Sequence, residues 1–229
     1  MVERVEEMSK KRGGRRREAE TSSTLSQKIA GVLLSIAGVA ILMGIITGEA
    51  LYPAPYNTAE NTISDLVGTM PSEGGIVLQP SATIFDATML VTGPMIIIGA
   101  YLVHRASRRR AAAVPLALLG IGVLGVGIFP GYVPVMHPIL ALTAFVSGGV
   151  AAIMAYKVAA APFRYISIVL GVITLVSVVL GFVFLDKWQF VEALGEGGTE
   201  RWIAYPVVLW LTMFGGYLMG HSRREPSDA

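Results

Sequence analysis

The sequence lacks cysteine altogether and is poor in charge. The absence of cysteine excludes disulfides, thiolate metal sites, cysteine nucleophiles and thiol redox chemistry. Asp, Glu, Lys and Arg make up 15% of the 229 residues, against about 25% in typical soluble domains. Hydrophobic residues make up 53%, and the mean hydropathy is +0.62. This composition indicates a protein whose main solvent is lipid.

Six apolar stretches approach or reach the length that crosses a bilayer. A hydrocarbon core of about 30 Å requires about 20 residues of helix. The stretches lie at residues 29–47, 84–103, 111–129, 138–156, 165–185 and 202–219. Their cores carry no charge, because the nearest ionisable residues, such as Asp86, lie at span ends. We therefore expect an all-α fold, a polytopic bundle of six transmembrane helices.

Lys and Arg are distributed unevenly between the two sides that alternating spans create. The side with the N-terminal tail, loops 104–111 and 157–164 and the C-terminal tail holds 16 of the 18. Because short cytoplasmic loops collect Lys and Arg, both termini are predicted to be cytoplasmic, in a multi-pass protein of the plasma membrane. A cleaved signal peptide ending near residues 48–50 is the alternative. We favour a retained anchor, because the first run of about 19 residues exceeds the usual h-region of about 7–15.

The termini are predicted to differ from the membrane domain at residues 29–220. Residues 1–28 are charged and rich in Ser and Thr, which predicts a disordered basic cytoplasmic tail. Residues 221–229 form a short second cytoplasmic tail. The basic clusters of the first tail suit an anionic leaflet better than nucleic acid, because no interleaved aromatic residues or folded module accompany them.

Small residues crowd three of the six stretches. They are Gly120, Gly122, Gly125 and Gly127 in the third, Gly148, Gly149, Ala151 and Ala152 in the fourth, and Gly215, Gly216 and Gly220 in the sixth. Small residues let helix backbones approach closely in lipid. The third stretch is expected to pack tightly, although its glycines could instead leave a cavity. The same faces could also support a homo-oligomer.

The first extracytoplasmic loop, at residues 49–83, is long and contains both polar and apolar residues. Loops of about 35 residues are usually functional or disordered, and the apolar content argues against disorder. Residues 58–67 are predicted to form a short helix. Ile63, Leu66 and Val67 would then face the bundle from above its mouth.

Polar and ionisable residues gather on the predicted outer side. The candidate catalytic residues are His137, Asp65 and Glu200, and the candidate binding residues are Asn61, Ser64, Asp86 and Arg201. His137 is the only histidine on this side. One His with two or three carboxylates suits a divalent metal ion, held by His137, Asp65, Asp86 and Glu200, or a general base oriented by an acid.

Structural roles are the alternative for the same residues. Asp86 and Glu200 could stabilise helix N-termini, and Ser64 could act as an N-cap. Arg201 could pair with Asp65 or Asp86, or clamp a lipid phosphate. Because no charge lies in the middle of a span, an ion-coupled transporter is disfavoured, and the lack of facing histidines argues against haem.

Several short motifs resemble the membrane family known as domain of unknown function 998. They are Asn61-Thr62-Ile63-Ser64-Asp65-Leu66, Ile84-Phe85-Asp86 followed by Gly93, Gly127-Ile128-Phe129-Pro130, His137 at the start of the fourth span, and Glu200-Arg201 before a span that contains Trp210. The resemblance covers residues 29–220 and implies six spans but no agreed activity. Members usually have Asn at the position of Asp86. The Ile-Ser-Asp element is also faintly similar to DRAM-type six-helix proteins, some relatives of which act in lipid-anchor remodelling.

These observations favour a protein that handles a lipid or other amphiphile at the outer leaflet. An enzyme with this site would be expected to hydrolyse or transfer a group on a lipid, with His137 as base or metal ligand. A small transporter or channel, and a non-catalytic scaffold subunit, are the alternatives. Membrane lipids are the expected partners in each case.

Overall fold

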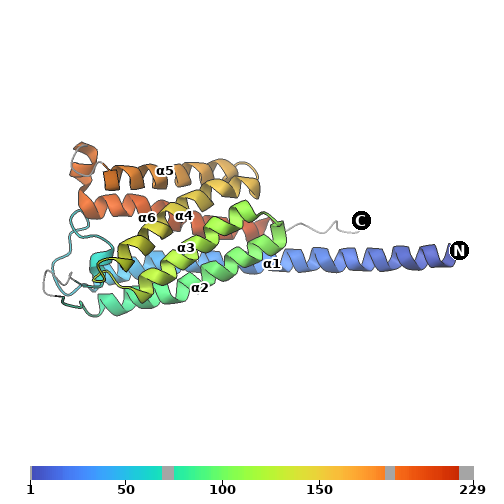
Figure 1. Ribbon diagram of the computed structural model, residues 1–229, viewed down its shortest axis with the longest axis horizontal. Helices are drawn as coiled ribbons and strands as arrows, with labels where there is room; N and C mark the ends of the chain where they lie inside the picture. Colours follow the sequence, from blue (N-terminus) through green and yellow to red (C-terminus); the bar gives the residue numbers. More distant parts are fainter. Residues whose placement is uncertain (1, 69–74, 184–188, 222–229) are drawn as a thin grey trace.

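Six long helices make up most of the chain (Figure 1). The structure is a computed structural model that describes residues 2–68, 75–183 and 189–221. The helices are α1 (Val2–Ala50), α2 (Ser81–Ser107), α3 (Arg110–Ile128), α4 (Met136–Met154), α5 (Phe163–Val183) and α6 (Gln189–Gly220), with the short 3₁₀ helices η1 (Ser64–Leu66) and η3 (Ala155–Lys157) between them. All six contain a segment long and apolar enough to cross a membrane. The prediction of an all-helical, multi-pass membrane fold is confirmed.

The helices form where apolar runs must satisfy their own backbone hydrogen bonds, and they end at residues that break this pattern. Helix α2 is followed by Arg108, which has a positive φ of 57°, and α3 is followed by Phe129, directly before Pro130 and Gly131. The sixth helix begins earlier than the predicted residue 202. It starts at Gln189 and bends at Gly195, whose φ is 71°, a conformation that glycine adopts without steric cost.

Helix α1 also begins earlier than predicted. Residues 2–28, expected to be disordered, continue the first membrane helix, and α1 projects past the other helices (Figure 1). Glu, Lys and Arg are good helix formers, and extending an existing helix avoids the cost of nucleation. Part of the segment also packs on the bundle: Ser23 Oγ donates to the Ala106 carbonyl at 3.2 Å, and Gln27 Nε2 donates to the Leu218 carbonyl at 3.2 Å.

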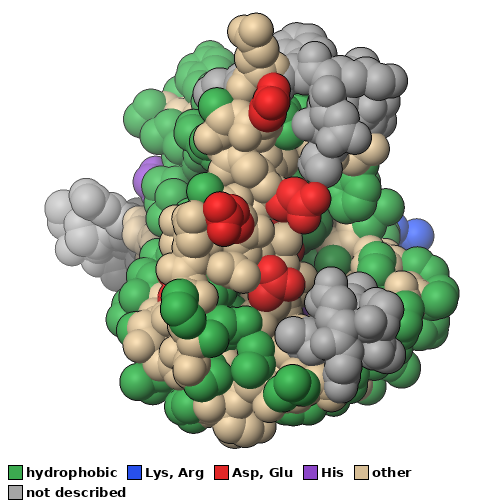
Figure 2. Space-filling model, turned by 90° about the vertical axis from the view of Figure 1, so that its left-hand side faces the viewer, with side chains coloured by type: hydrophobic (Ala, Val, Ile, Leu, Met, Phe, Trp, Pro, Cys, Tyr) green, Lys and Arg blue, Asp and Glu red, His purple; other side chains and the backbone are tan. Residues whose placement is uncertain are grey.

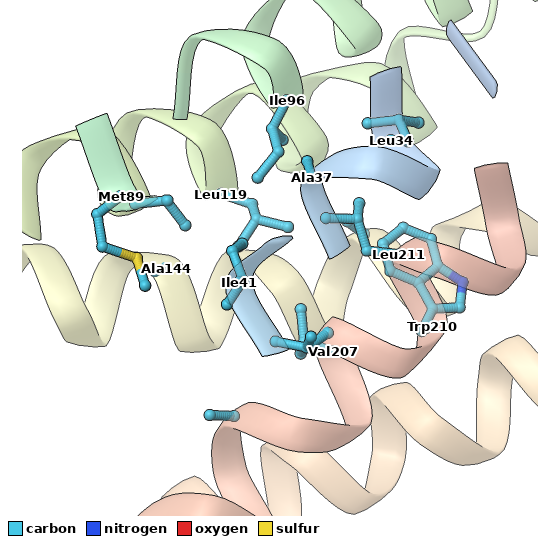
Figure 3. Packing of buried hydrophobic residues seen from close by; sticks show 14 of the residues in the cluster. Leu34, Ala37, Ile41, Met89, Ile96, Leu119, Ala144, Val207, Trp210 and Leu211 are labelled. Atoms are coloured by element: carbon cyan, nitrogen blue, oxygen red, sulfur yellow. The ribbon is translucent and has the colours of Figure 1, made fainter. Parts of the chain in front are cut away.

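Five of the helices surround a common interior. Helix α1 contacts α2 and α6, α2 contacts α3, α3 contacts α4, and α4 contacts α6. Helix α5 lies outside this ring, against α4 and α6 (Figure 1). Figure 3 shows Ile41, Met89, Leu119, Ala144 and Val207, one from each helix of the ring, in the space between them. The interior of the ring is therefore apolar at this depth.

Glycines allow the close contacts within the ring. An added Cβ atom at Gly122 would lie 2.6 Å from the Ala144 nitrogen of α4, and one at Gly215 would lie 2.4 Å from the Gly31 carbonyl oxygen of α1. The small residues of these helices therefore serve packing within one chain. Added Cβ atoms at Gly216 and Gly220 would meet nothing within 4 Å. A homo-oligomer through the glycine faces stays a prediction.

Gly215→Ala should destabilise the bundle, because its methyl group would overlap the backbone of α1. Overpacking of this kind costs about 1–3 kcal/mol. Gly216→Ala is the matched control, one residue further along the same helix and without a neighbour within 4 Å. In thermal unfolding in detergent, we expect Gly215→Ala to melt below the wild type. Gly216→Ala should melt at or above it, because alanine is the better helix former. Equal melting temperatures for the two variants would contradict this contact.

Candidate functional site

Residues 51–68 fold over one end of the bundle, which we call the loop end and define by residues 51–68, 75–80, 129–135 and 189–197. Ile63, Leu66 and Val67 are buried there, at 5%, 0% and 0% exposure, which confirms their predicted position against the bundle. The predicted helix at residues 58–67 is much shorter, because only η1 is helical.

A pair of reciprocal hydrogen bonds between Thr62 and Asp65 explains why the helical turn begins at η1 and not at residue 58. The Thr62 N–H donates to Asp65 Oδ2 at 2.8 Å, and the Asp65 N–H donates to Thr62 Oγ1 at 3.3 Å. This is the exchange made by a capping box at the start of a helix. The Asp65 carboxylate therefore holds the loop in shape, which is the structural alternative for this candidate catalytic residue.

Arg201 is the centre of the hydrogen bonds that fix the loop to the bundle. Its two terminal nitrogens make five of them: Nη1 donates to the carbonyl oxygens of Thr58, Asn61 and Gly197 at 3.0, 2.9 and 2.7 Å, and Nη2 donates to Glu49 Oε1 at 2.6 Å and to the Tyr56 hydroxyl at 2.7 Å. The guanidinium presents donors in a fixed fork, which suits several acceptors at once. It therefore joins the end of α1, the loop and α6.

The ion-pair partner of Arg201 is Glu49 rather than the expected Asp65 or Asp86. The two side chains are 10% and 18% exposed. Sequence reasoning missed Glu49 and Tyr56; the one available signal was an acidic residue at the end of the first apolar run. The Tyr56 hydroxyl also donates to the Thr62 carbonyl at 2.8 Å. Burial raises the pKa of Tyr56, which keeps that donor protonated.

Asn61 has a structural place in the same loop. Its Oδ1 accepts a hydrogen bond from the Asn57 N–H at 2.9 Å, and its carbonyl accepts one from Arg201. These contacts explain why a polar residue stands at position 61, and the explanation requires no ligand.

Glu200 and Arg201 follow the bend of α6 at Gly195. The Gly197 N–H beyond the bend donates to the Ala59 carbonyl at 2.9 Å, so the loop also satisfies a backbone donor of the helix. Neighbouring helical residues point about 100° apart. Arg201 faces a groove beside α5, while Glu200 faces the interior of the ring.

Glu200 brings a carboxylate to the inner surface of the loop. Its Oε2 accepts a hydrogen bond from the Ile63 N–H, 137 residues away in the sequence. It lines the interior together with Ser64, whose hydroxyl lies 3.0 Å from the Thr62 hydroxyl. Glu200 and Ser64 therefore line one space inside the ring.

His137, the second residue of α4, lines the same interior and is 6% exposed. Its Nδ1 lies 2.8 Å from the Phe129 carbonyl oxygen, at the turn that ends α3. A carbonyl oxygen only accepts, so Nδ1 carries the proton. In the neutral ring Nε2 then keeps its lone pair, and it is the atom that can accept a hydrogen bond or a proton.

These three side chains lie around a cavity of about 90 Å³ within the five-helix ring. The other lining residues are apolar: Ile41, Ile45, Ile63, Phe85, Met89, Ile96, Leu119, Val123, Val126, Ala141, Ala144, Phe145, Ala204, Val207, Val208 and Leu211. Ser64 belongs to the loop end, and His137 and Glu200 follow shortly after segments of it in the chain. The cavity thus has one end with polar groups and an apolar remainder, and we call it the central cavity.

Asp86 does not share this arrangement. It is not among the residues that line the central cavity, and its Oδ1 is buried without a hydrogen-bond partner. Within residues 2–68, 75–183 and 189–221, no group of three or more His, Cys, Asp or Glu is placed to hold a metal ion. A divalent metal at His137, Asp65, Asp86 and Glu200 therefore stays a prediction, and no step below depends on it.

Acidic side chains lie on the surface of the loop end, as Figure 2 shows. Glu60, Glu192 and Glu196 are exposed there. Arg201 is the one Lys or Arg in the described parts of 49–80, 129–137 and 189–201, and it is buried. This end of the protein therefore presents negative charge to its surroundings.

Comparison with known proteins places the chain in a family without assigning it an activity. Residues 35–217 match the family described as protein of unknown function, DUF998. No curated protein and no solved structure matches the chain. The similarity to DRAM-type proteins stays a prediction. The match includes every residue that lines the central cavity. This multi-pass membrane protein belongs to the DUF998 family.

Proposed function

We propose that the protein binds an amphiphile, with its apolar tail in the central cavity and its polar head beside Ser64, His137 and Glu200. The observation that carries the proposal is the composition of the cavity wall. Ligand sites are typically apolar cavities with a few polar groups that fix orientation. Here the three polar groups are gathered at one end, which is the arrangement that an amphiphile requires.

The length of the cavity wall suits one leaflet of a bilayer. On α2 the wall runs from Phe85 to Ile96, and on α6 from Glu200 to Leu211. At about 1.5 Å per residue, each of these eleven-residue steps spans roughly 16 Å. A hydrocarbon core is about 30 Å thick. A head group at the loop end would therefore place its tail near the bilayer midplane.

An occupant would also remove the cost of an empty apolar space. Cavities in protein cores cost about 24 cal/mol per Å³. For about 90 Å³ this amounts to roughly 2 kcal/mol. A tail that moves from lipid into the cavity gains little from the hydrophobic effect, since both surroundings are apolar. Filling the space is thus the main contribution of the tail, and the polar end decides which head group binds.

The charge distribution supports a site on the outer face of the plasma membrane. The basic residues Arg105, Arg108, Arg109, Arg110, Lys157 and Arg164 lie at the helix ends opposite the loop end. By the positive-inside rule that opposite end is cytoplasmic. The amphiphile would then come from the outer leaflet.

Ion transport is supported less well. A polar path would have to continue below Ser64, His137 and Glu200, where the cavity wall is apolar. The hydroxyls of Thr88, Thr92 and Thr143 donate instead to carbonyl oxygens of their own helices, at 2.7 Å each.

Hydrolysis of an ester-linked amphiphile is a second candidate, favoured by the fixed ring of His137. His137 Nε2 would take a proton from water as the water oxygen attacks the ester carbonyl, and would return it to the leaving alkoxide, giving an acid and an alcohol. His137→Gln should then abolish the release of acid, measured at an amphiphile concentration that saturates the cavity label of each protein. Equal release by both proteins would exclude this role.

Photo-cross-linking tests the proposed binding site. The probe is a long-chain alcohol with a diazirine near the end of its tail, added to the protein in phospholipid nanodiscs. We expect labelled peptides from the cavity wall, including Val123 of α3 and Val207 of α6, and loss of this label with excess unlabelled alcohol. Labels confined to lipid-facing residues, such as Val91 and Ile98, would contradict the proposal.

A further inference from the structure

The polar end of the central cavity contains hydrogen-bond acceptors but no positive charge. Glu200 contributes a carboxylate, and His137 contributes Nε2, the acceptor left when Nδ1 donates to Phe129. Ser64 adds a hydroxyl, which both donates and accepts. None of the described residues that line the cavity is Lys or Arg. Glu200 already accepts a hydrogen bond from the Ile63 N–H, so a head group that donates would add to the hydrogen bonds of its carboxylate and would give His137 Nε2 a donor.

Arg201, the nearest cation, does not bring a positive charge to the polar end of the central cavity. Arg201 follows Glu200 directly, but it faces the groove beside α5, and both of its terminal nitrogens are engaged by Glu49, Tyr56 and three backbone carbonyls. Its Nε is buried without a hydrogen-bond partner, but the side chain lines the groove and not the central cavity, so a phosphate or carboxylate head in the cavity does not meet it. Arg201 therefore does not act as the lipid-phosphate clamp that the sequence allowed.

A negatively charged head in the cavity would meet like charge without compensation. At a pH at which Glu200 is ionised, its carboxylate would lie beside that head, in surroundings where charges are screened much less than in water. It would also have to pass the exposed Glu60, Glu192 and Glu196 of the loop end. A hydroxyl or ammonium head meets neither obstacle, and it can donate to Glu200 and His137 at once.

We infer that the central cavity selects amphiphiles whose head group donates hydrogen bonds and carries no negative charge, such as long-chain alcohols and amines, and that Glu200 determines this selection. The inference rests on the proposed function and adds the chemical class of the head group. Phospholipids and free fatty acids are excluded as preferred occupants, although they carry suitable tails.

Competition with the diazirine alcohol in nanodiscs tests this selection. The competitors share one saturated tail and differ in the head: primary alcohol, primary amine, carboxylate and phosphate monoester. We expect the alcohol and the amine to displace the cavity label at concentrations at least about tenfold lower than the two anions. A tenfold difference corresponds to about 1.4 kcal/mol.

Glu200→Gln provides the variant, because the amide keeps an accepting oxygen and removes the charge. Hydrogen bonds to charged groups contribute about 1.5–3 kcal/mol and neutral ones about 0.5–1.5. We therefore expect the amine to lose about tenfold in the variant, the alcohol clearly less, and the anions to gain. Glu20→Gln, at an exposed residue of α1 near the opposite end, is the control and should leave all four competitors unchanged.

The outcomes separate the two proposals. Cavity labelling that all four competitors displace equally would overturn the head-group selection and leave amphiphile binding intact. The head-group selection by Glu200 would also be overturned if Glu200→Gln, with a wild-type melting temperature, ranked the four competitors in the same order as the wild type. If Glu200→Gln does not fold, the ranking of the four competitors on the wild type still decides. Absence of any displaceable cavity label would instead overturn the proposed function itself.

Discussion

Arg201→Met should be severely destabilised, by about 3–5 kcal/mol, because it removes one partner of a largely buried ion pair. The Glu49 carboxylate would remain at the end of α1 without its guanidinium. The carbonyls of Thr58, Asn61 and Gly197 would also lose a donor. Thermal unfolding in detergent, followed by size-exclusion chromatography, measures the loss. We expect little folded protein at temperatures that the wild type withstands.

Two further variants show whether loss of the ion pair causes the destabilisation of Arg201→Met. Arg164→Met removes an exposed arginine that donates to the Ala159 carbonyl at 3.0 Å, and it should remain close to the wild type. Glu49→Gln combined with Arg201→Met removes the unpaired charge as well. The double variant should therefore be more stable than Arg201→Met alone. Strictly additive losses would contradict the coupling between the two side chains.

Ala204→Phe should abolish most binding in the central cavity. Ala204 lies one helical turn after Glu200, is 8% exposed and faces the cavity. A phenyl ring there occupies the space proposed for the tail. We expect the concentration of diazirine alcohol that gives half-maximal cavity label to rise at least about tenfold, which corresponds to about 1.4 kcal/mol.

Ala87→Phe is the matched control, since Ala87 is exposed on α2 and its ring would lie in lipid. It should bind like the wild type. Because Ala204→Phe fills an empty space rather than a packed one, we expect it to stay folded, with a melting temperature close to that of the wild type. A folded Ala204→Phe protein that still takes cavity label at wild-type concentrations would show that the tail binds elsewhere.

Local sequence rules predicted the spans because the physical cause is local. A run of apolar residues in lipid must be helical, and Pro130-Gly131 must interrupt it. The burial of Ile63, Leu66 and Val67 followed from their spacing in the loop. The N-terminal extension of α1 was missed because a charged segment that continues a stable helix needs no apolar face of its own.

The candidate site was predictable only in part, because it depends on long-range geometry. Asp65 serves the capping of η1, and Asp86 lies outside the central cavity, although both share its side of the protein. The partner of Arg201 lies 152 residues away, at a position set by how the loop folds. The cavity exists because the side chains of five helices leave part of the space between them unfilled, and no local sequence pattern predicts this. The third span illustrates this: its glycines pack closely, while Val123 and Val126 between them line the cavity.

The most direct test of amphiphile binding is a crystal structure from a lipidic mesophase that contains a long-chain alcohol brominated near the end of its tail. The anomalous signal locates the bromine atom. The proposed binding mode predicts a bromine peak inside the five-helix ring, near Val123 and Val207, with the head group beside Glu200 and His137. Bromine peaks along the lipid-facing surfaces of the helices, with none in the central cavity, would contradict it.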